Sequence, residues 1–252
     1  MTAISANGIT IEYETHGQEG NPALLLIRGL GSQMIHWPAA LMQRLAAAGF
    51  YVVTFDNRDA GLSTKFEAAG AMDVADLMQR AKAGEDIEVP YLLDDMAADV
   101  IGLMDALSIV TAHVAGISMG GAIAQLLAAK HGGRLRSMTS IMAQSGNLDV
   151  PQGSPQAMAA LMRAGGDEST RDGAIAANMA TARILAGPLY PTSEADRRAM
   201  VERAYDRGHC PDGRTRQRAA IIKNGNRVAM LRTIKIPCQV IHGMDDALLN
   251  IA

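Results

Sequence analysis

Residues 113–130 read HVAGISMGGAIAQLLAAK, and this stretch decides the fold. Its first five residues predict a buried strand, and the segment from Gly120 to Lys130 predicts a helix that ends at the glycines after it. Between them, Gly116 to Gly120 matches the pattern G-x-S-x-G, which in this context holds a serine hydroxyl on a sharp, strained turn. A Cβ at either end of the pattern would strike the neighbouring helix and strand. Ser118 is therefore the candidate nucleophile, and Gly116 and Gly120 are the structural residues of its turn.

Elements on either side of this stretch alternate between strand and helix. Apolar runs at 23–27 and 51–55 predict strands that are buried on both faces, and helical patterns follow them at 39–48 and 91–107. The other expected elements are a hairpin around Asn7-Gly8, strands at 137–142 and 238–241, and a helix at 215–232. Alternation of this kind requires right-handed crossovers. The expected fold class is α/β, a mostly parallel sheet with helices on both faces.

The alternation lapses between about Gly146 and Arg214. Proline and glycine separate short helical stretches there, at 156–163 and 193–205, which are rich in methionine and alanine. We interpret this segment as an inserted helical cap over 146–214, with a core formed by residues 1–145 and 215–252. Met158 and Met162 are candidates for an adaptable apolar substrate pocket, and plain packing is equally compatible with them.

Composition and charge limit the class of protein. With 252 residues, of which 48% are hydrophobic and 19% charged, the chain has the composition of a globular domain. A formal net charge of -3 argues against a nucleic-acid partner, since phosphates require clustered basic residues. Arg214, Arg216 and Arg218 form the densest basic group, and their alternate spacing predicts the solvated face of a helix.

Cysteine content and hydropathy bear on the compartment. Cys210 and Cys238 lack the spacing of a zinc site or of a disulfide framework. No basic leader precedes an apolar run, and no window approaches the roughly 20 apolar residues of a membrane span. We expect a cytoplasmic protein with a small-molecule substrate, with no cofactor, no metal and no membrane partner.

Four segments recur in the order of a known family: residues 28–31 (RGLG), 55–63 (FDNRDAGLS), 116–120 (GISMG) and 242–246 (HGMDD). With them the chain resembles the α/β-hydrolase superfamily, most closely the small esterase-like branch of the aclacinomycin methylesterase type. The resemblance implies two oxyanion donors, the backbone N–H groups of Leu30 and Met119. The chain departs from the family at Arg28, where histidine is frequent, and at Asp59, where glycine is frequent. Neither departure changes a backbone donor, so we expect altered loop contacts and no lost chemistry.

The family's chain order of serine, acid and histidine implies an acid after the last predicted strand. Asp246 is where the family's acid sits; Asp245 is the alternative, and its other role would be to cap the turn. Asp56, Arg58 and Ser63 form a further polar group at a strand end. In the family this stretch shapes a loop, so we favour a structural role over a catalytic one.

A serine hydroxyl needs a base, and no histidine follows Asp246. Of the six histidines, His36 lies near the oxyanion loop and His242 ends the last predicted strand. Each is better explained as structural, because the base must touch both Ser118 and the acid. In the family a further strand and a final helix follow. We therefore expect these 252 residues to be a shortened form with the last strand and helix missing, nearly inactive alone, whose open sheet edge favours homo-oligomers.

Other functions compete with this interpretation. Gly29 and Gly31 after a strand imitate a dinucleotide-binding loop, but Met34 occupies the third glycine position and the helix begins only near Pro38. A serine nucleophile is compatible with esters, lactones, thioesters, some carbon–carbon cleavages and cofactor-free perhydrolysis, because all involve attack on a carbonyl. The resemblance favours hydrolysis of a carboxylic ester of a small or medium-sized apolar substrate. A catalytically silent binding protein stays open as the alternative.

Overall fold

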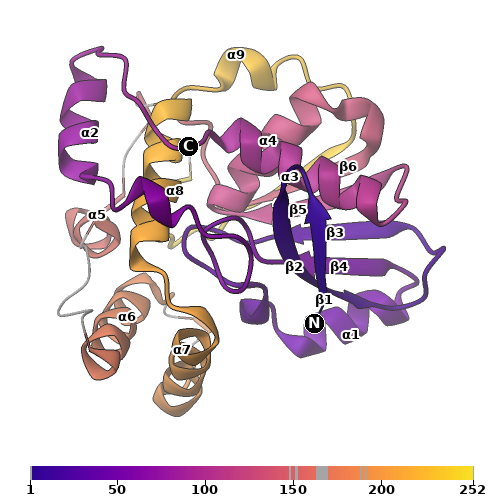
Figure 1. Cartoon of the computed structure of the whole chain (residues 1–252), viewed down its shortest axis with the longest axis horizontal. Coiled ribbons are helices and arrows are strands. Elements are labelled where there is room, and N and C mark those ends of the chain that lie inside the picture. The colour runs from indigo at the N-terminus through magenta and orange to yellow at the C-terminus, as the bar shows by residue number, and fades with distance from the viewer. Residues whose placement is uncertain are drawn as a thin grey trace.

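The computed structural model describes residues 2–147, 149–150, 153–162, 170–187, 189–190 and 192–251. Within these ranges seven strands form one sheet in the order β1-β2-β4-β3-β5-β6-β7 (Figure 1). The strands are β1 Thr2–Ala6, β2 Ile9–His16, β3 Ala23–Ile27, β4 Tyr51–Phe55, β5 Ala112–Ile117, β6 Leu135–Ile141 and β7 Cys238–Ile241. β1, β2 and β4 pair antiparallel, and all neighbours from β4 to β7 are parallel. The α/β class and the mostly parallel sheet are confirmed.

The first two strands form the predicted hairpin. Asn7 and Gly8 have φ angles of 49° and 73°. Two successive positive φ values give the tight turn whose twist matches that of the flanking strands. This turn starts the sheet at its antiparallel edge and leaves the later, parallel strands to carry the site.

Helices cover both faces of the sheet, as the apolar strands require. Leu25 and Ile27 of β3 pack with α3 (Leu93–Ala106) and α4 (Met119–Lys130), whereas Leu26 packs on the opposite face with Met42 of α1 (Ala39–Ala47). Successive side chains of a strand point to opposite faces, so a strand covered on both sides is apolar throughout.

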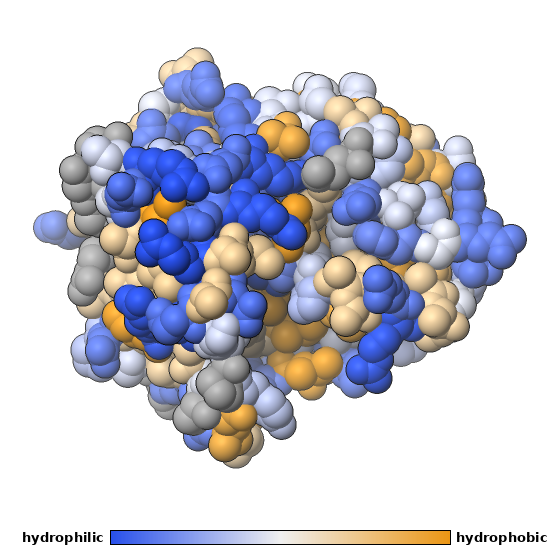
Figure 2. Space-filling model, turned by 90° about the horizontal axis from the view of Figure 1, so that it is seen from below, coloured by the Kyte–Doolittle hydropathy of each residue, from blue (hydrophilic) through white to orange (hydrophobic). Residues whose placement is uncertain are grey.

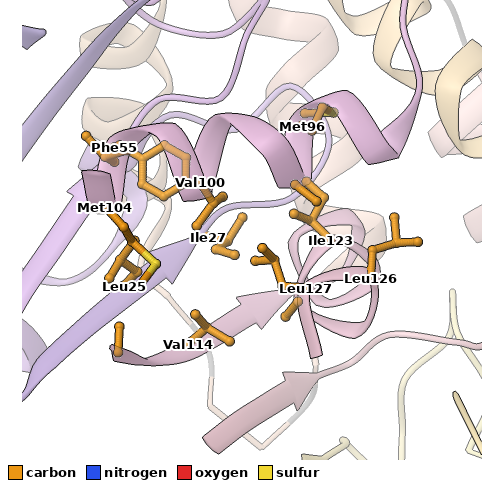
Figure 3. Packing of buried hydrophobic residues seen from close by; sticks show 14 of the residues in the cluster. Leu25, Ile27, Phe55, Met96, Val100, Met104, Val114, Ile123, Leu126 and Leu127 are labelled. Carbon is orange, nitrogen blue, oxygen red and sulfur yellow. The ribbon is translucent and has the colours of Figure 1, made fainter. Parts of the chain in front are cut away.

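The larger core lies between the sheet and the helices α3 and α4. Figure 3 shows side chains of β3 and β5 facing those of α3 and α4, with Phe55 of β4 beside them. Full burial of each large apolar side chain stabilises the fold by about 1.5 to 3 kcal/mol. The members labelled there are Leu25, Ile27, Phe55, Met96, Val100, Met104, Val114, Ile123, Leu126 and Leu127.

The segment 146–214, interpreted as a helical cap, contains three described helices, and its last boundary falls inside a fourth. The helices α5 (Pro155–Met162), α6 (Arg171–Leu185) and α7 (Glu194–Gly208) gather on one side of the molecule beside α8 (Figure 1). α8 is one continuous helix, Pro211–Asn224, which crosses the boundary predicted at residues 214 and 215. It is followed by the short helix α9, Val228–Leu231, so the single helix predicted over 215–232 is wrong.

The helix α2, Val74–Lys82, is not among the elements predicted from the sequence. Its N-cap is Asp73, whose side chain accepts a hydrogen bond from the amide of Asp76 at 3.0 Å. Leu77 of this helix packs in a small core with Ala219 of α8. The short 3-10 helices are η1 Met34–His36, η2 Glu67–Ala69 and η3 Gly132–Arg134.

The arginines of α8 are not a solvated helix face, and that expectation is wrong. Arg216 is 1% exposed and Arg218 is 6% exposed. α8 contacts α2 and α3, and its central residues from Arg216 to Ala220 are all buried. A buried guanidinium requires partners, and Arg216 finds its partner in Asp59, described below.

β7 is the exposed edge of the sheet. Among the described residues it pairs with β6 alone, all of its residues are exposed, and Val240 is 70% exposed. An apolar strand with unpaired backbone groups is a template for pairing with another chain. Association through this edge stays a prediction. No helix within the described ranges combines the length and the apolar character needed to cross a membrane.

Candidate active site

Ser118 lies at the turn between β5 and α4, where its backbone has a φ of 56° and a ψ of -120°. Such a conformation costs a non-glycine residue on the order of 1 to 3 kcal/mol and persists only where the surroundings impose it. The Ser118 amide donates to the carbonyl of Ile141 at 2.9 Å, and the Ser118 carbonyl accepts from the amide of Ala122 at 3.1 Å. The residue is partly exposed. The strained turn predicted from the sequence is present.

Close backbone contacts explain the two glycines of this turn. A Cβ on Gly116 would lie 2.0 Å from the carbonyl oxygen of Gly120, and a Cβ on Gly120 would lie 2.3 Å from the carbonyl oxygen of Ile27. The atoms in the way belong to the backbone, so they cannot rotate aside as a side chain does. Any larger residue at either position would therefore displace Ser118.

The loop after β3 passes beside the serine. A Cβ on Gly29 would lie 3.6 Å from Ser118 Oγ, so the next residue, Leu30, follows directly at the site. Among the described residues, the amides of Leu30 and Met119 donate to no protein acceptor, and Met119 is the first residue of α4, where a helix leaves its amides unpaired. Both predicted donors are available to an oxygen that becomes negatively charged beside Ser118.

The strand register brings the predicted acid to the same edge of the sheet as the serine. Ile117, Ile141 and Ile241 pair across β5, β6 and β7. The turns that carry Ser118 and Asp246 therefore follow strands that are two strand spacings, or about 10 Å, apart.

Asp246 caps its own turn with one carboxylate oxygen and contacts a histidine with the other. Oδ1 accepts hydrogen bonds from the amides of Leu248 and Leu249, both at 2.9 Å. Oδ2 lies 3.4 Å from Nε2 of His242. Asp245 is exposed, and the turn-capping role considered for it belongs to Asp246. Asp246 stays the candidate acid.

None of the histidines supplies a base to Ser118 within the described part of the chain. His242 contacts the acid but makes no hydrogen bond to the serine. Nδ1 of His36 accepts from the amide of Gln33 at 3.1 Å, and Nδ1 of His113 lies 2.7 Å from a serine hydroxyl of β6. These contacts agree with the structural roles expected for them.

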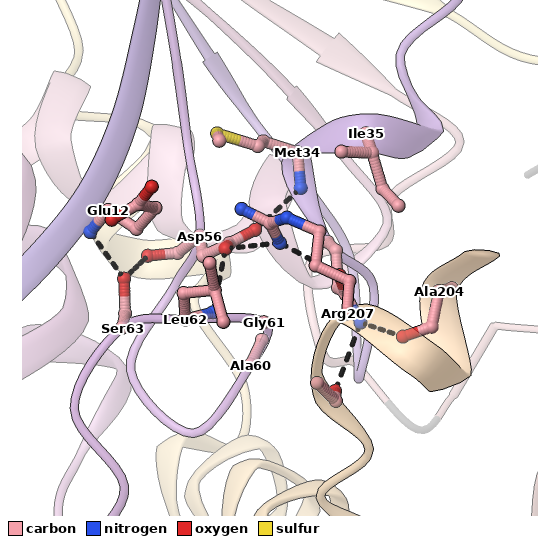
Figure 4. Close-up of polar contacts among 12 residues, drawn as sticks. Glu12, Met34, Ile35, Asp56, Ala60, Gly61, Leu62, Ser63, Ala204 and Arg207 are labelled. Atoms are coloured by element: carbon pink, nitrogen blue, oxygen red, sulfur yellow. Dashed lines mark hydrogen bonds and ion pairs between the residues drawn. The ribbon is translucent and has the colours of Figure 1, made fainter. Parts of the chain in front are cut away.

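Asp56 joins the loop after β3 to the loop after β4. It is fully buried, and its carboxylate accepts from the amide of Met34 at 2.8 Å, from the amide of Leu62 at 2.9 Å and from Arg207 Nη1 at 2.6 Å (Figure 4). Ser63 donates to the Asp56 carbonyl at 2.6 Å and accepts from a backbone amide of β2. All of these are contacts within the fold, which agrees with the structural role favoured for this group.

Asp59 explains one of the two departures from the family pattern. Arg216 donates to both of its carboxylate oxygens at 2.8 Å, the Tyr91 hydroxyl donates at 2.7 Å, and the amide of Phe66 donates at 2.8 Å. Burial opposes ionisation, but these donors hold the pKa of Asp59 below its usual value. Arg58 forms a second buried pair, with an aspartate of α3. The altered loop contacts expected at Asp59 are therefore an anchor for α8.

A cavity of about 750 Å³ opens between the oxyanion loop and the helices α6, α7 and α8. The face seen in Figure 2 is hollowed between the cap side and the rest of the molecule, with hydrophobic residues along part of the hollow. Met200 lines this cavity, whereas Met158 is half-buried in α5 and is not among its lining residues. The side chain of Met162 lies outside the described residues. A pocket role for Met158 and Met162 stays a prediction.

Three polar residues that hold the site together were not predicted. Gln217 of α8 accepts from the amide of Gly31 at 2.7 Å, Gln33 donates to carbonyls at the end of α7, and Arg207 reaches Asp56. Each contact joins positions more than 150 residues apart in sequence. A single sequence carries no local signal for such pairs.

His36 makes the stability of the fold depend on pH. Burial, together with the charge of Arg28, lowers its pKa from 6.5 to about 4. Between these values the unfolded chain binds the proton and the folded chain does not, so stability falls as the pH falls from about 6.5 to 4. For this one proton the slope approaches, at most, about 1.4 kcal/mol per pH unit.

Replacing His36 with asparagine should reduce this loss. The amide oxygen of asparagine can accept from Gln33 as Nδ1 does, but it takes up no proton. We expect urea midpoints at pH 7 and pH 5 to differ less in His36→Asn than in the wild type. His16→Asn, in β2, is the control and should keep the wild-type difference. An unchanged pH difference in His36→Asn would exclude His36 as its source.

Comparison with known proteins agrees with this architecture. Rhodomycin D methylesterase of a Streptomyces species is 33% identical over 147 residues, which are 58% of this chain and 43% of that protein. The match thus spans less than half of the relative's length. The enol-lactonase from Burkholderia xenovorans has a TM-score of 0.69 at 24% identity, over 96% of this chain and 81% of that one. A thermophilic esterase from Thermogutta terrifontis has a TM-score of 0.73 at 19% identity, over 99% and 83%.

The structural likenesses, at identities below 25%, concern the fold alone. The sequence comparison goes further, because the family model described as the alpha/beta hydrolase fold matches residues 22–251. With its strained serine turn between β5 and α4 and a match over nearly its whole length, the chain belongs to the α/β-hydrolase fold family.

Proposed function

We propose that this protein hydrolyses a carboxylic ester of a small or medium-sized, largely apolar substrate through an acyl-enzyme on Ser118. One observation carries the proposal. Ser118 is strained and partly exposed, and beside it the amides of Leu30 and Met119 donate to no acceptor among the described residues. A strained nucleophile and preorganised donors are what acyl transfer needs. The methylesterase relative supports an ester as the bond that is cleaved.

In the proposed reaction, Ser118 Oγ attacks the ester carbonyl while a histidine removes its proton. The carbonyl oxygen becomes an oxyanion and receives hydrogen bonds from Leu30 and Met119. The histidine returns the proton to the alcohol oxygen, the ester C–O bond breaks, and the acyl group remains on Ser118. Water then attacks the acyl-enzyme and releases the carboxylic acid.

The acid and the base have separate places in this scheme. Asp246 would orient the imidazole through its Oδ2, the oxygen that accepts no backbone amide and lies 3.4 Å from Nε2 of His242. None of the described histidines bonds to Ser118. The proposed mechanism therefore requires an imidazole in the space between the turn of Ser118 and the turn of Asp246. We expect activity to require a histidine in that space.

Covalent labelling tests the nucleophile without knowledge of the substrate. An activity-directed fluorophosphonate should phosphonylate the protein on one tryptic peptide, the one that contains Ser118, and mass spectrometry should find no adduct in Ser118→Ala. Ser108 offers a matched control because it is a serine with almost the same φ, 55°, at a different turn. Ser108→Ala should be labelled as the wild type is. An adduct on another residue would disprove the assignment of the nucleophile.

A further inference from the structure

The cavity beside the oxyanion loop contains basic side chains that the fold does not use. One of its walls is formed by the loop from Arg28 to Gln33, and the opposite wall by α6, α7 and the first half of α8. A cationic group inside a protein is costly unless it is paired. The partners of each charged residue on these walls therefore decide what the cavity is suited to bind.

Arg218 is a buried cation without a counter-ion among the described residues. It is 6% exposed, it lines the cavity, and its Nε is buried without a hydrogen-bond partner. No carboxylate in the described ranges forms an ion pair with it, and the nearby charge that acts on it is another arginine, Arg214. Burial accordingly lowers the pKa of Arg218 to about 10, which leaves it charged at neutral pH.

Arg28 is in a similar position on the opposite wall. Its Nε donates to the hydroxyl of Ser32 at 3.1 Å, and its guanidinium carbon lies 4.7 Å from the centre of the Trp37 ring. Stacking on an aromatic ring fixes the plane of a guanidinium but leaves its outer N–H groups for a ligand. No carboxylate of the described chain pairs with Arg28, and burial lowers its pKa to about 10.

The other charged residues of the lining do not neutralise this pair. Arg197 is paired with Glu194 of the same helix. Asp196 is exposed and accepts from the hydroxyl of Ser193, and it is the one carboxylate among the described lining residues. Counted over the described lining residues, the cavity thus has a positive interior, while the wall formed by α7 is partly aliphatic through Met200 and Val201.

Arg28 also brings this positive region close to Ser118. It immediately precedes Gly29, whose Cβ position is 3.6 Å from Ser118 Oγ. On the other side, a Cβ on Gly31 would contact the side chain of Arg214, one helical turn before Arg218. An extended molecule held at the serine would therefore run past the loop from Arg28 to Gly31 into the cavity that both arginines line.

We propose that the substrate is an ester whose acyl chain ends in a carboxylate, and that Arg28 and Arg218 bind this carboxylate while Ser118 attacks the ester group. The inference rests on the proposed function and narrows its substrate class. The aliphatic wall accommodates the chain, and two guanidinium groups match the planar carboxylate geometry. Hydrolysis consumes one water and yields an alcohol and a dicarboxylate.

Binding of the product measures this site without any turnover. Adipate should bind the wild-type protein in isothermal titration calorimetry, and adipamide, its neutral analogue of the same shape, should not. Arg218→Met and Arg28→Met should each weaken adipate binding by about tenfold to a hundredfold, since a charge-assisted hydrogen bond is lost. Ser118→Ala should bind adipate as the wild type does. Equal adipate affinity in the wild type and in Arg218→Met, or no adipate binding, overturns the proposal.

Thermal stability separates a binding role of Arg218 from a structural one. An unpaired buried charge destabilises the empty protein, so Arg218→Met should unfold at the wild-type temperature or above it. Arg227 is the matched control: burial also lowers its pKa to about 10, but it donates to Gln125, Asn224 and backbone carbonyls outside the cavity. Arg227→Met should lower the unfolding temperature and keep adipate binding. A large loss of stability in Arg218→Met would show that Arg218 serves the fold.

Kinetics distinguish failure of this inference from failure of the proposed function. Half esters of 4-nitrophenol with glutarate, adipate, pimelate and suberate are compared with the esters of the matching monoamides. We expect at least one half ester to have a higher kcat/KM than its amide partner, and this preference to disappear in Arg218→Met. Hydrolysis of both series without preference overturns the carboxylate site alone. Hydrolysis of neither series counts against the proposed function, and adipate binding still decides the site.

Discussion

Replacement of Ser118 by alanine is expected to lower kcat for any ester the protein hydrolyses by at least about 10³-fold. In the proposed mechanism the substitution removes the atom that would form the acyl-enzyme, while the amides of Leu30 and Met119 remain to bind the carbonyl oxygen. KM should therefore change much less than kcat. Steady-state hydrolysis of 4-nitrophenyl esters of increasing chain length gives both constants.

The fold should survive this substitution. Alanine has a backbone preference close to that of serine, and the hydrogen bonds that fix the turn come from the backbone of residue 118 and not from its side chain. Far-UV circular dichroism and the thermal midpoint should match the wild type. Undiminished ester hydrolysis by a folded Ser118→Ala protein would mean that a different residue is the nucleophile.

The largest effect on stability is expected from Arg216→Met. The side chains of Arg216 and Asp59 are 1% and 0% exposed, and the substitution leaves the Asp59 carboxylate buried with its charge uncompensated. Loss of one partner of such a pair costs about 3 to 5 kcal/mol. Urea unfolding followed by circular dichroism should show a midpoint far below that of the wild type.

Two further variants identify the cause of this loss. Arg183 also donates to both oxygens of a carboxylate, that of Glu194, but this pair is on the surface, so Arg183→Met should shift the midpoint far less. The double variant Asp59→Asn with Arg216→Met removes both charges and should recover part of the stability, because asparagine tolerates the φ of 64° at position 59. If the double variant is no more stable than Arg216→Met, lost packing and not the unpaired charge explains the effect.

The local signals in the sequence were sufficient for the sheet and for the serine turn. The strand, the G-x-S-x-G turn and the helix follow one another between residues 112 and 130. The residue types there are therefore determined by contacts with close neighbours in the sequence. The helix α2 carried a similar local signal, since Asp73 precedes a helical apolar spacing at Val74 and Leu77. The charged and polar residues around this spacing are also typical of a loop, so the signal alone does not distinguish the two.

The burial of charged residues could not be predicted in the same way. Arg216 and Arg218 have the same spacing pattern as a solvated helix face, and only their distant surroundings distinguish them. The partner of Arg216 lies 157 positions earlier in the chain, and Arg218 has no charged partner in the described residues. Whether a charge on a helix is exposed depends on which other elements cover that helix, and a local pattern holds no information on this.

The contacts of α7 have a consequence for how molecules reach the serine. Gln33 donates to the carbonyls of Ala204 and Gly208, and Arg207 is bound to the buried Asp56, so the last turn of α7 is fixed to the oxyanion loop. We therefore expect the helices of the proposed cap to move by rotation about this fixed end, with a displacement that grows with distance from it. Access then depends on transient widening between α6 and the loop, on the microsecond to millisecond timescale of such hinge motions. Because the loop that carries Leu30 and Gln33 is bound to the end of α7, we expect it to keep its position beside Ser118 during such motions, so that the proposed site stays assembled when a substrate arrives.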